Sequence, residues 1–588
     1  MLISRNRLKN FIFLLSLFSF LFLSTATFAS VFNVTNEIEL RDALSTAAMN
    51  EEDDTINIAA GTYNTSGTTF TYTPAAGENN ALTIVGAGAE ATMLDGGNSD
   101  QVLRIETFGL ADDSNAHIII NNLTIQNGNN NTTNDGGGLF ILTNSANVSI
   151  HNCEFFNSFV VANPEFGNGS SGGAMFLVTG GGGSVSIENC EFDNNSAVAV
   201  GIEIGLGIGG AVSISGSDVT LSNSIFNNNS AEGEEGALGG ALNVQIGGDL
   251  ILTNNTFSEN SANVASEILG SGAVGGGANL VADGDIMLTD NTFDNNSSNS
   301  GAPFGGGLGG GVSVGSSVGN IALTNNIFLN NSANSKGTNQ TSGGGANVSN
   351  FISGDITLVN NIFVNNFAAT LGGGANVSTP SGIVTLTNNT ITENSADTDS
   401  GGGLRVGLGF FGEGADTTAN IYNNIVFNNT AALDGDDIFI SDDGDFNNLG
   451  SPVNLFNNDF SDFFSACENT IGCIPNISEG NNIDEDPLFV DAASGDVHLT
   501  KGSPTIDTGD PNAPALPATD FEGDPRDIDG DGDGTTPGIG VDEFVPGVGD
   551  GGGDGCSIAQ SVAQTPIPLY LLILLFVLMR RLWRRYIR

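Results

Sequence analysis

Short segments with alternating apolar and polar residues recur along most of this chain. Segments 250–253, 286–289 and 356–359 place apolar side chains at every second position, between Gly and Asn residues. A period of two over four or five residues indicates β-strands rather than helices. We therefore expect an all-β fold.

The strands belong to a repeat that runs from about residue 150 to about residue 430. Each copy ends a strand in Asn, places Phe three residues later and a second Asn three residues after that, as in Asn223, Phe226 and Asn229. The variable spacing of these copies indicates one structural turn per repeat, with tolerant loops between. The anchor residues are Phe155, Phe192, Phe226, Phe257, Phe293, Phe328, Phe363, Ile391 and Val426.

A glycine run that closes on a small or apolar residue stands ahead of most copies, as at 239–241 and 343–346. A unit with three short strands cannot bury a face alone, but stacked copies bury a continuous core. The sequence therefore predicts a right-handed parallel β-helix of about ten coils. Phe would form one interior stack, and the Asn three positions earlier would form a second stack at a sharp corner, broken only by Asp290.

The two ends of this β-helix need protection. Within residues 30–80, the segment 36–49 is expected to be a helix with Asn36 as its N-cap. It would cover the first coil, which otherwise exposes apolar side chains and strand edges. The repeats extend over 81–440, and residues 441–548, richer in Asp and Pro, are expected to form a C-terminal capping region.

The repeated phrases carry a family resemblance. Gly209-Gly210-Ala211 and the run from Phe257 to Asn260 resemble the double repeat of the chlamydial polymorphic outer-membrane proteins, which are surface adhesins built as β-helices. The resemblance covers about residues 135 to 430. It implies an adhesive role at a cell surface.

The C-terminal tail carries a second and stronger resemblance, because its matching runs are long, ordered and not repetitive. It is similar to bacterial right-handed β-helix surface proteins with exchangeable, choice-of-anchor C-terminal segments. This similarity implies attachment to the cell surface. The matching runs are 486–491, 495–499, 502–507 and 538–544.

The N-terminus has the features of a secretory signal. Basic residues within the first nine positions precede the apolar run 11–22, and small residues occupy the cleavage positions near 27–29. Residues 1–29 are therefore expected to be removed on export, although a permanent N-terminal helix is the alternative.

Residues 549–588 combine a glycine spacer, Cys556, the apolar segment 567–579 and a cluster of arginines. Thirteen apolar residues give about 20 Å of helix, short of a ~30 Å hydrocarbon core, so a permanent transmembrane helix is marginal. The order resembles tripartite sorting signals of bacterial surface proteins that are cleaved in the membrane. It implies an inner-membrane tether first and then lipidation at Cys556 as an anchor on the cell surface or outer membrane.

The charge distribution limits the possible partners. Only six Lys and Arg lie between the basic clusters at the two ends of the chain, together with all 66 Asp and Glu. So acidic a surface excludes nucleic acid as a partner and discourages edge-to-edge association of strands. Oligomeric state is left open by the sequence.

Five cysteines divide into two pairs and one single residue. Cys153 and Cys190 occupy equivalent places in successive turns, within disulfide range, and stacked reduced thiols are the alternative. Cys467 and Cys473 can close a small loop, and export favours both bonds. Cys556 is left over, as an anchor residue would be.

One segment has the spacing of a cation site. Asp527, Asp529, Asp531 and Asp533 alternate with small residues, and carboxylate oxygens at that spacing suit a structural Ca²⁺ ion. A solvated acidic turn is the alternative. The pattern lacks the Glu at the twelfth place that an EF-hand requires.

Catalytic residues are sparse. Arg405 is the one candidate base for a polysaccharide lyase, and His117, His151 and His498 form no evident pair with Asp for hydrolysis. The sequence therefore favours an adhesin, or a module that binds a surface glycan or protein, over an enzyme. A polysaccharide lyase or hydrolase and a structural envelope protein without a ligand are the alternatives.

Overall fold

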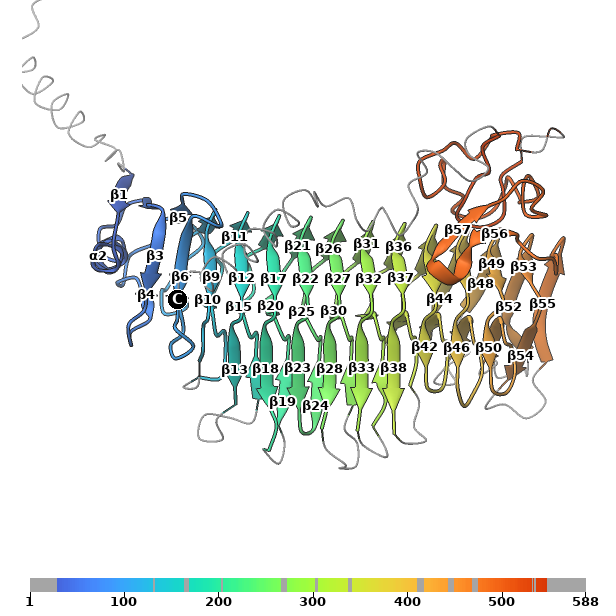
Figure 1. The fold of residues 1–588 in the computed structure, drawn as a ribbon, viewed down its shortest axis with the longest axis horizontal. Coiled ribbons are helices and arrows are strands. Elements are labelled where there is room, and N and C mark those ends of the chain that lie inside the picture. Colours follow the sequence, from blue (N-terminus) through green and yellow to red (C-terminus); the bar gives the residue numbers. More distant parts are fainter. Residues whose placement is uncertain are drawn as a thin grey trace, which may run out of the picture.

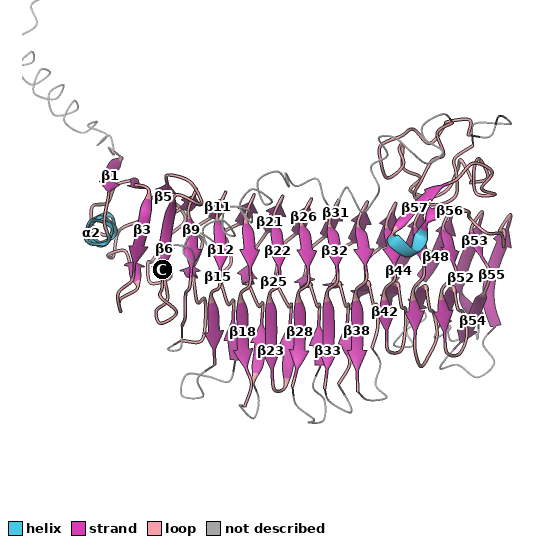
Figure 2. Cartoon of the chain, in the orientation of Figure 1, coloured by secondary structure: helices cyan, strands magenta, loops and turns pink. Residues whose placement is uncertain are grey.

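The chain forms a parallel β-solenoid that is almost entirely strand (Figures 1 and 2). The computed structural model describes residues 29–130, 133–162, 169–201, 205–265, 272–301, 305–336, 341–409, 417–442, 449–467, 474–530, 532 and 536–546. The predicted parallel β-helix is thereby confirmed. Each turn of the chain, here called a rung, adds one strand to each of three long sheets, A, B and C, which enclose a single apolar core.

Sheet A opens each rung with an alternating strand such as β26 (Leu250–Thr253), in which Leu250 and Leu252 are buried. Neighbouring strands pair in parallel, so equivalent residues of successive rungs lie side by side. Sheet A contains β1 (Ser30–Val34), β2 (Asp54–Ile58), β5 (Leu82–Gly86), β8 (Ile118–Asn121), β11 (Val148–His151), β16 (Val185–Glu188), β21 (Val219–Ser222), β26, β31 (Ile286–Thr289), β36 (Ile321–Thr324), β40 (Ile356–Val359), β44 (Gly382–Thr387), β48 (Thr417–Tyr422), β52 (Leu449–Phe456) and β55 (Ile474–Gly480).

Sheet B follows a sharp corner and carries a buried anchor residue at the inward position of its short strands, Phe from Phe155 to Phe363 and then Ile391 and Val426. It contains β3 (Gly61–Asn64), β6 (Thr92–Asp95), β9 (Thr124–Gln126), β12 (Glu154–Phe156), β17 (Glu191–Asp193), β22 (Ile225–Asn227), β27 (Thr256–Ser258), β32 (Thr292–Asp294), β37 (Ile327–Leu329), β41 (Ile362–Val364), β45 (Thr390–Thr392), β49 (Ile425–Phe427) and β53 (Asp459–Phe460).

Sheet C closes the rung and leads back to sheet A. It contains β4 (Phe70–Tyr72), β7 (Leu103–Glu106), β10 (Leu139–Thr143), β15 (Met175–Thr179), β20 (Val212–Gly216), β25 (Leu242–Ile246), β30 (Ala278–Ala282), β35 (Val312–Ser316), β39 (Ala346–Asn350), β43 (Ala375–Thr379), β47 (Leu404–Leu408), β51 (Ile438–Asp442) and β54 (Phe463–Cys467).

From β13 onward the rungs add a short fourth strand, and five of them add a fifth, neither of which was predicted. They form sheets D and E, a thin fin that projects from the solenoid (Figure 1). Small residues allow sheets D and E to approach each other closely in the fin. A side chain on Gly207, for example, would collide with the backbone of Glu232. Sheet D contains β13 (Phe159–Val161), β18 (Ser196–Ala199), β23 (Ser230–Gly233), β28 (Ser261–Val264), β33 (Ser297–Ser300), β38 (Ser332–Ser335), β42 (Phe367–Ala368), β46 (Ser395–Ala396) and β50 (Thr430–Ala431), and sheet E contains β14 (Gly169–Ser171), β19 (Leu206–Ile208), β24 (Gly236–Leu238), β29 (Gly272–Val274) and β34 (Gly307–Leu308).

Left-handed backbone makes the corners, as predicted. Asn254 has φ +54° at the corner between sheets A and B, and its equivalents, including Asp290 with φ +57°, have the same conformation. Asn and Asp tolerate this region better than most residues. Gly239, with φ +65°, makes the corner ahead of sheet C, which explains the repeated glycine runs.

The predicted stack of Phe rings runs through the core. The rings from Phe155 to Phe363 lie 4.5–5.1 Å apart between centroids, with planes 4–6° from parallel. All are fully buried. Each ring therefore packs offset against its neighbours in the rungs above and below.

Two buried ladders of Asn connect the rungs. The side-chain oxygen of Asn296 accepts hydrogen bonds from the backbone N–H and the side-chain amide of Asn260, at 3.1 and 3.0 Å. Its own amide donates to Asn331 Oδ1 at 3.0 Å and to the carbonyl of Phe257 at 2.9 Å. Both polar atoms of the Asn296 side chain are thus paired, which offsets the cost of burying them. The second ladder runs from Asn255 to Asn482.

The expected helix near the N-terminus is present as α2 (Glu37–Ala47). The side chain of Asn36 accepts hydrogen bonds from the N–H groups of Ile38 and Glu39, as an N-cap does. Leu40 and Leu44 are buried in the main core beside the first rungs. That α2 protects the open end of the solenoid stays a prediction.

The position of the C-terminal segment differs from the expected cap. The chain continues the solenoid as far as β55, and residues 486–546, here called the C-terminal lobe, fold back along the outer face of sheet B (Figure 1). The lobe contains a two-stranded antiparallel sheet, β56 (Phe489–Asp491) and β57 (Asp496–Leu499), joined by the 3₁₀ turn Ala492–Ser494.

Candidate functional site

Apolar residues on the outside of sheet B explain why the C-terminal lobe lies there. In β27 and β32 the outward residues are polar, but in β37 they are Ile327 and Leu329 and in β41 they are Ile362 and Val364. These side chains pack against Val497 and Val541 of the lobe, and Ile425 packs against Leu499, Ile506 and Ile539. Each buried aliphatic side chain of this kind contributes about 1.5–3 kcal/mol.

Polar contacts fix the lobe at a defined height along the solenoid. The amide of Asn388 donates to the carbonyls of Gly538 and Gly540, at 3.0 and 2.9 Å. The guanidinium of Arg526 is buried, with Nη1 3.5 Å from a Glu543 carboxylate oxygen and Nη2 2.7 Å from Asn360 Oδ1. Burial raises the pKa of Glu543 to about 7.

A cleft of ≈420 Å³ lies between the lobe and the solenoid. Phe427, Phe489 and Leu488 supply its apolar surface, whereas Glu393 and Asn428 supply polar groups joined by a 2.6 Å hydrogen bond. Asp486, Pro487, Ala492, Thr392 and Thr500 complete the lining. A concave site with aromatic faces and a few fixed polar groups is typical of small-ligand binding.

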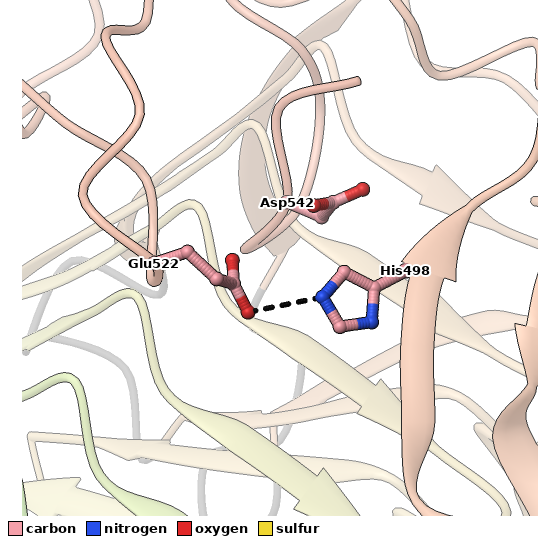
Figure 3. Close-up of side chains that lie close together, drawn as sticks. All are labelled: His498, Glu522 and Asp542. Carbon is pink, nitrogen blue, oxygen red and sulfur yellow. Dashed lines mark ion pairs between the residues drawn. The ribbon is translucent and has the colours of Figure 1, made fainter. Parts of the chain in front are cut away.

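A second cluster lies on the strand β57 and two neighbouring turns of the lobe. His498 Nδ1 is 2.6 Å from Asp496 Oδ1, and His498 Nε2 is 3.2 Å from Glu522 Oε1. Asp542 lies across from the imidazole and accepts a 2.8 Å hydrogen bond from the N–H of Leu499 (Figure 3). Asp496 and His498 share one face of the strand because they are two residues apart.

The pKa values of His498 and Asp542 are both raised in this cluster. The hydrogen bond that His498 donates to Glu522 raises the pKa of His498 to about 10, against the lowering effect of burial. Burial raises the pKa of Asp542 to about 7, since this carboxylate is only 9% exposed. The carboxylates of Asp496, Glu522 and Asp542 thus lie around the single imidazole of His498.

This cluster was not predicted as a site, although His498 and Asp542 lie in the tail runs 495–499 and 538–544. Glu522 comes from a turn that no motif marked. The three segments meet in the folded lobe, which packs on sheet B, and no spacing in the sequence marks their approach.

The predicted calcium site is only partly within the described residues. Asp529 Oδ1 accepts the N–H of Gly532 at 2.7 Å, and Asp527 belongs to the same turn, whereas Asp531 and Asp533 lie outside the described residues. The structure thus places one of these carboxylates in an ordinary turn hydrogen bond. Calcium at Asp527–Asp533 stays a prediction.

The predicted bond between Cys153 and Cys190 is not formed in this structure. Both residues are buried free thiols in equivalent positions of successive rungs. Each Sγ lies near backbone carbonyls, at 3.2 Å from His151 O and 3.3 Å from Glu188 O. The thiols thus occupy the start of the second Asn ladder, where polar side chains point to carbonyls of the same corner. The predicted pair of Cys467 and Cys473, and Cys556, involve side chains outside the described residues.

Arg405, the candidate base, lies on the outer face of sheet C in β47. Its guanidinium donates to Asn376 Oδ1 at 2.9 Å and to Ser441 Oγ at 2.7 Å, one rung to either side. Asn376 in turn donates to Asn347 Oδ1 at 2.8 Å. These contacts make Arg405 part of a polar ladder between rungs, a structural role for this side chain.

No family model, curated protein or solved structure matches the chain. Among the residues that the structure describes, no helix has the length and apolarity that crossing a membrane requires. The predicted signal 1–29 and the apolar segment 567–579 lie outside them, except for Ala29.

Proposed function

We propose that this chain is an exported β-helix protein of the bacterial cell surface that binds a glycan in the cleft between the C-terminal lobe and sheet B. The observation that carries the proposal is the lining of that cleft, in which Phe427 and Phe489 stand beside Glu393 and Asn428. Sugar rings present apolar faces and hydroxyl groups. Aromatic faces with carboxylate and amide partners suit both.

The acidity of the chain narrows the ligand class. Glu393 and Asp486 line the cleft, and the chain has 66 Asp and Glu against 14 Lys and Arg. An anionic polysaccharide would be repelled, so a neutral glycan is the better fit.

The test is a glycan array probed with the full chain, followed by titration of the best neutral glycan. Phe427→Ala and Glu393→Gln should each weaken binding about tenfold or more, as for residues at the centre of an interface. Phe351→Ala is the matched control, because Phe351 is an aromatic residue 49% exposed outside the cleft. Absence of binding, or equal loss in the control, would contradict the proposal and leave a structural envelope role.

Export and anchoring are the second part of the proposal and rest on the terminal sequences alone. Cys556 would carry lipid after cleavage of the tail, and two acyl chains would be needed for a stable anchor. Cys556→Ser should release the protein into the medium or leave an unprocessed precursor. Mass spectrometry that finds an intact, unmodified peptide from Met579 to Arg588 on the surface protein would contradict processing.

A further inference from the structure

The cluster around His498 has the composition of a metal site. His498, Glu522 and Asp542 each offer one ligand atom, and these atoms lie within 4.8 Å of one another. They come from β57, from the turn after Phe521 and from the segment that follows Gly540 (Figure 3). An imidazole nitrogen with two carboxylate oxygens is a common donor set for Zn²⁺ and related ions.

The imidazole is already oriented as a metal ligand. Asp496 holds Nδ1 at 2.6 Å, which favours a proton on that nitrogen, and Nε2, whose own proton the ion would replace, faces Glu522 and Asp542. A carboxylate behind the ring of a ligating His is the usual outer-shell arrangement, because it fixes the tautomer and raises the basicity of Nε2.

The separations fit bonds to a small ion. Two ligands at about 2.0–2.2 Å from Zn²⁺ in tetrahedral geometry lie about 3.4 Å apart. His498 Nε2 and Glu522 Oε1 are 3.2 Å apart. Two atoms bound to one such ion lie at most about 4.2 Å apart. The three ligand atoms here lie within 4.8 Å of one another, so a side-chain movement of up to about 1 Å brings Asp542 into the set.

The local charge also favours a divalent cation. Asp496, Glu522 and Asp542 surround a single imidazole, and Asp520 increases the negative potential at Asp542. Arg526, the nearby cation, is already engaged with Glu543, Asn360 and the carbonyl of Val541. An ion held by Nε2 and two carboxylates would offset this excess and link three segments of the lobe.

We propose that His498, Glu522 and Asp542 bind one Zn²⁺-type divalent cation, with Asp496 as a positioning residue for the imidazole. The site is separate from the glycan cleft and from the calcium predicted at Asp527–Asp533. Ca²⁺ does not suit it, because calcium prefers six to eight oxygen ligands.

The experiment is a calorimetric titration of the chelator-treated full chain with Zn²⁺ and, separately, with Ca²⁺. We expect one Zn²⁺ per chain, a rise in the melting temperature on binding, and a loss of this site in His498→Gln. Asp496→Asn should weaken Zn²⁺ binding 10–100-fold, as loss of an outer-shell carboxylate does. His151→Gln is the control, because His151 also faces a carboxylate, Glu188 at 3.4 Å, and should leave binding unchanged.

A second variant, Glu522→Gln, distinguishes loss of the site from a folding defect in His498→Gln. It changes an outer turn of the lobe, so its circular dichroism should stay unchanged while Zn²⁺ binding weakens at least tenfold. No saturable Zn²⁺ binding to the native chain would overturn the proposal and leave His498 as an ion-paired imidazolium. Zn²⁺ binding that is equal in native chain, His498→Gln and Glu522→Gln would overturn it as well.

Discussion

The guanidinium of Arg526 donates a 2.7 Å hydrogen bond to the side-chain oxygen of Asn360, a residue 166 positions earlier in the chain. Asn360 is one of the left-handed corner residues between sheets A and B. The contact therefore ties the C-terminal lobe directly to the framework of the solenoid. It is one of several polar contacts in this interface, and Arg526 is only 5% exposed there.

Replacing Arg526 should loosen the lobe without unfolding the solenoid. Arg526→Ala leaves the buried carboxylate of Glu543 without its cation, which typically costs about 3–5 kcal/mol. Hydrogen exchange should become faster over residues 489–544 and stay unchanged over the rungs of the fin. Lys501→Ala, at an exposed cation of the same lobe, is the control. Equal protection of the lobe in both variants would contradict the assigned role.

Interrupting the buried Asn ladder should destabilise the solenoid. Asn296→Ala removes the acceptor for two donors of Asn260 and the amide that serves Phe257 and Asn331. Each unsatisfied buried group costs about 1–3 kcal/mol. Guanidinium unfolding should therefore shift to lower denaturant. Asn334→Ala, at a half-buried amide of the fin, should shift it much less, and an equal shift would argue against the ladder as a main source of stability.

Glu191 should make stability depend on pH. Burial raises the pKa of Glu191 to about 7, and the facing carboxylate of Glu154 adds to the shift. From about pH 4.5 to pH 7 the folded state keeps a proton that the unfolded state has lost, so the free energy of unfolding falls as pH rises.

Glu191→Gln should therefore stabilise the protein at pH 8, by about 1–2 kcal/mol after allowance for screening by solvent. At pH 4 the same variant should be nearly neutral. Thermal melts of both proteins at the two pH values measure the difference. A gain of the same size at both pH values would show that the ionisation of Glu191 is not its cause.

The thiols of Cys153 and Cys190 should be inert in the native protein. Burial raises the pKa of Cys190 well above its ordinary value, and the reactive species of a cysteine is the thiolate. Alkylation followed by peptide mass spectrometry should find neither residue labelled before unfolding and both labelled in denaturant without reductant. Labelling that requires a reductant would instead reveal the disulfide that export favours.

The repeat was sufficient to predict the solenoid because its residues act locally. Asn254 makes a corner, Phe257 fills the core and Gly239 allows the next turn, each within a single rung. The parallel pairing of rungs follows once every rung has the same residues at the same places. The fin was not predicted, because its Ser, Ala and Gly residues show no alternation of apolar and polar side chains.

The C-terminal lobe could not be placed from its own sequence. The change from polar to apolar at the outward positions of sheet B, beginning at Ile327 and continuing at Ile362 and Val364, was the available signal that something covers that face. No repeat in the sequence indicates which segment of the chain covers that face. The His498 cluster depends on that packing and was missed for the same reason.

The lobe also sets a limit on how this protein can change in length over evolution. Among the described residues, the packing and hydrogen bonds of the lobe reach the rungs from Ile327 onward. Because a rung of a solenoid contacts mainly its neighbours, a whole rung can be gained or lost ahead of Ile327 without disturbing the lobe. The lobe reaches Asn360, Asn388, Asn423 and Asn457 on successive rungs, at a spacing fixed by its own loops. Insertion of a rung within that stretch would move these four corners out of register with the lobe. Repeat number should therefore vary among descendants of this gene in the first part of the solenoid and stay constant under the lobe.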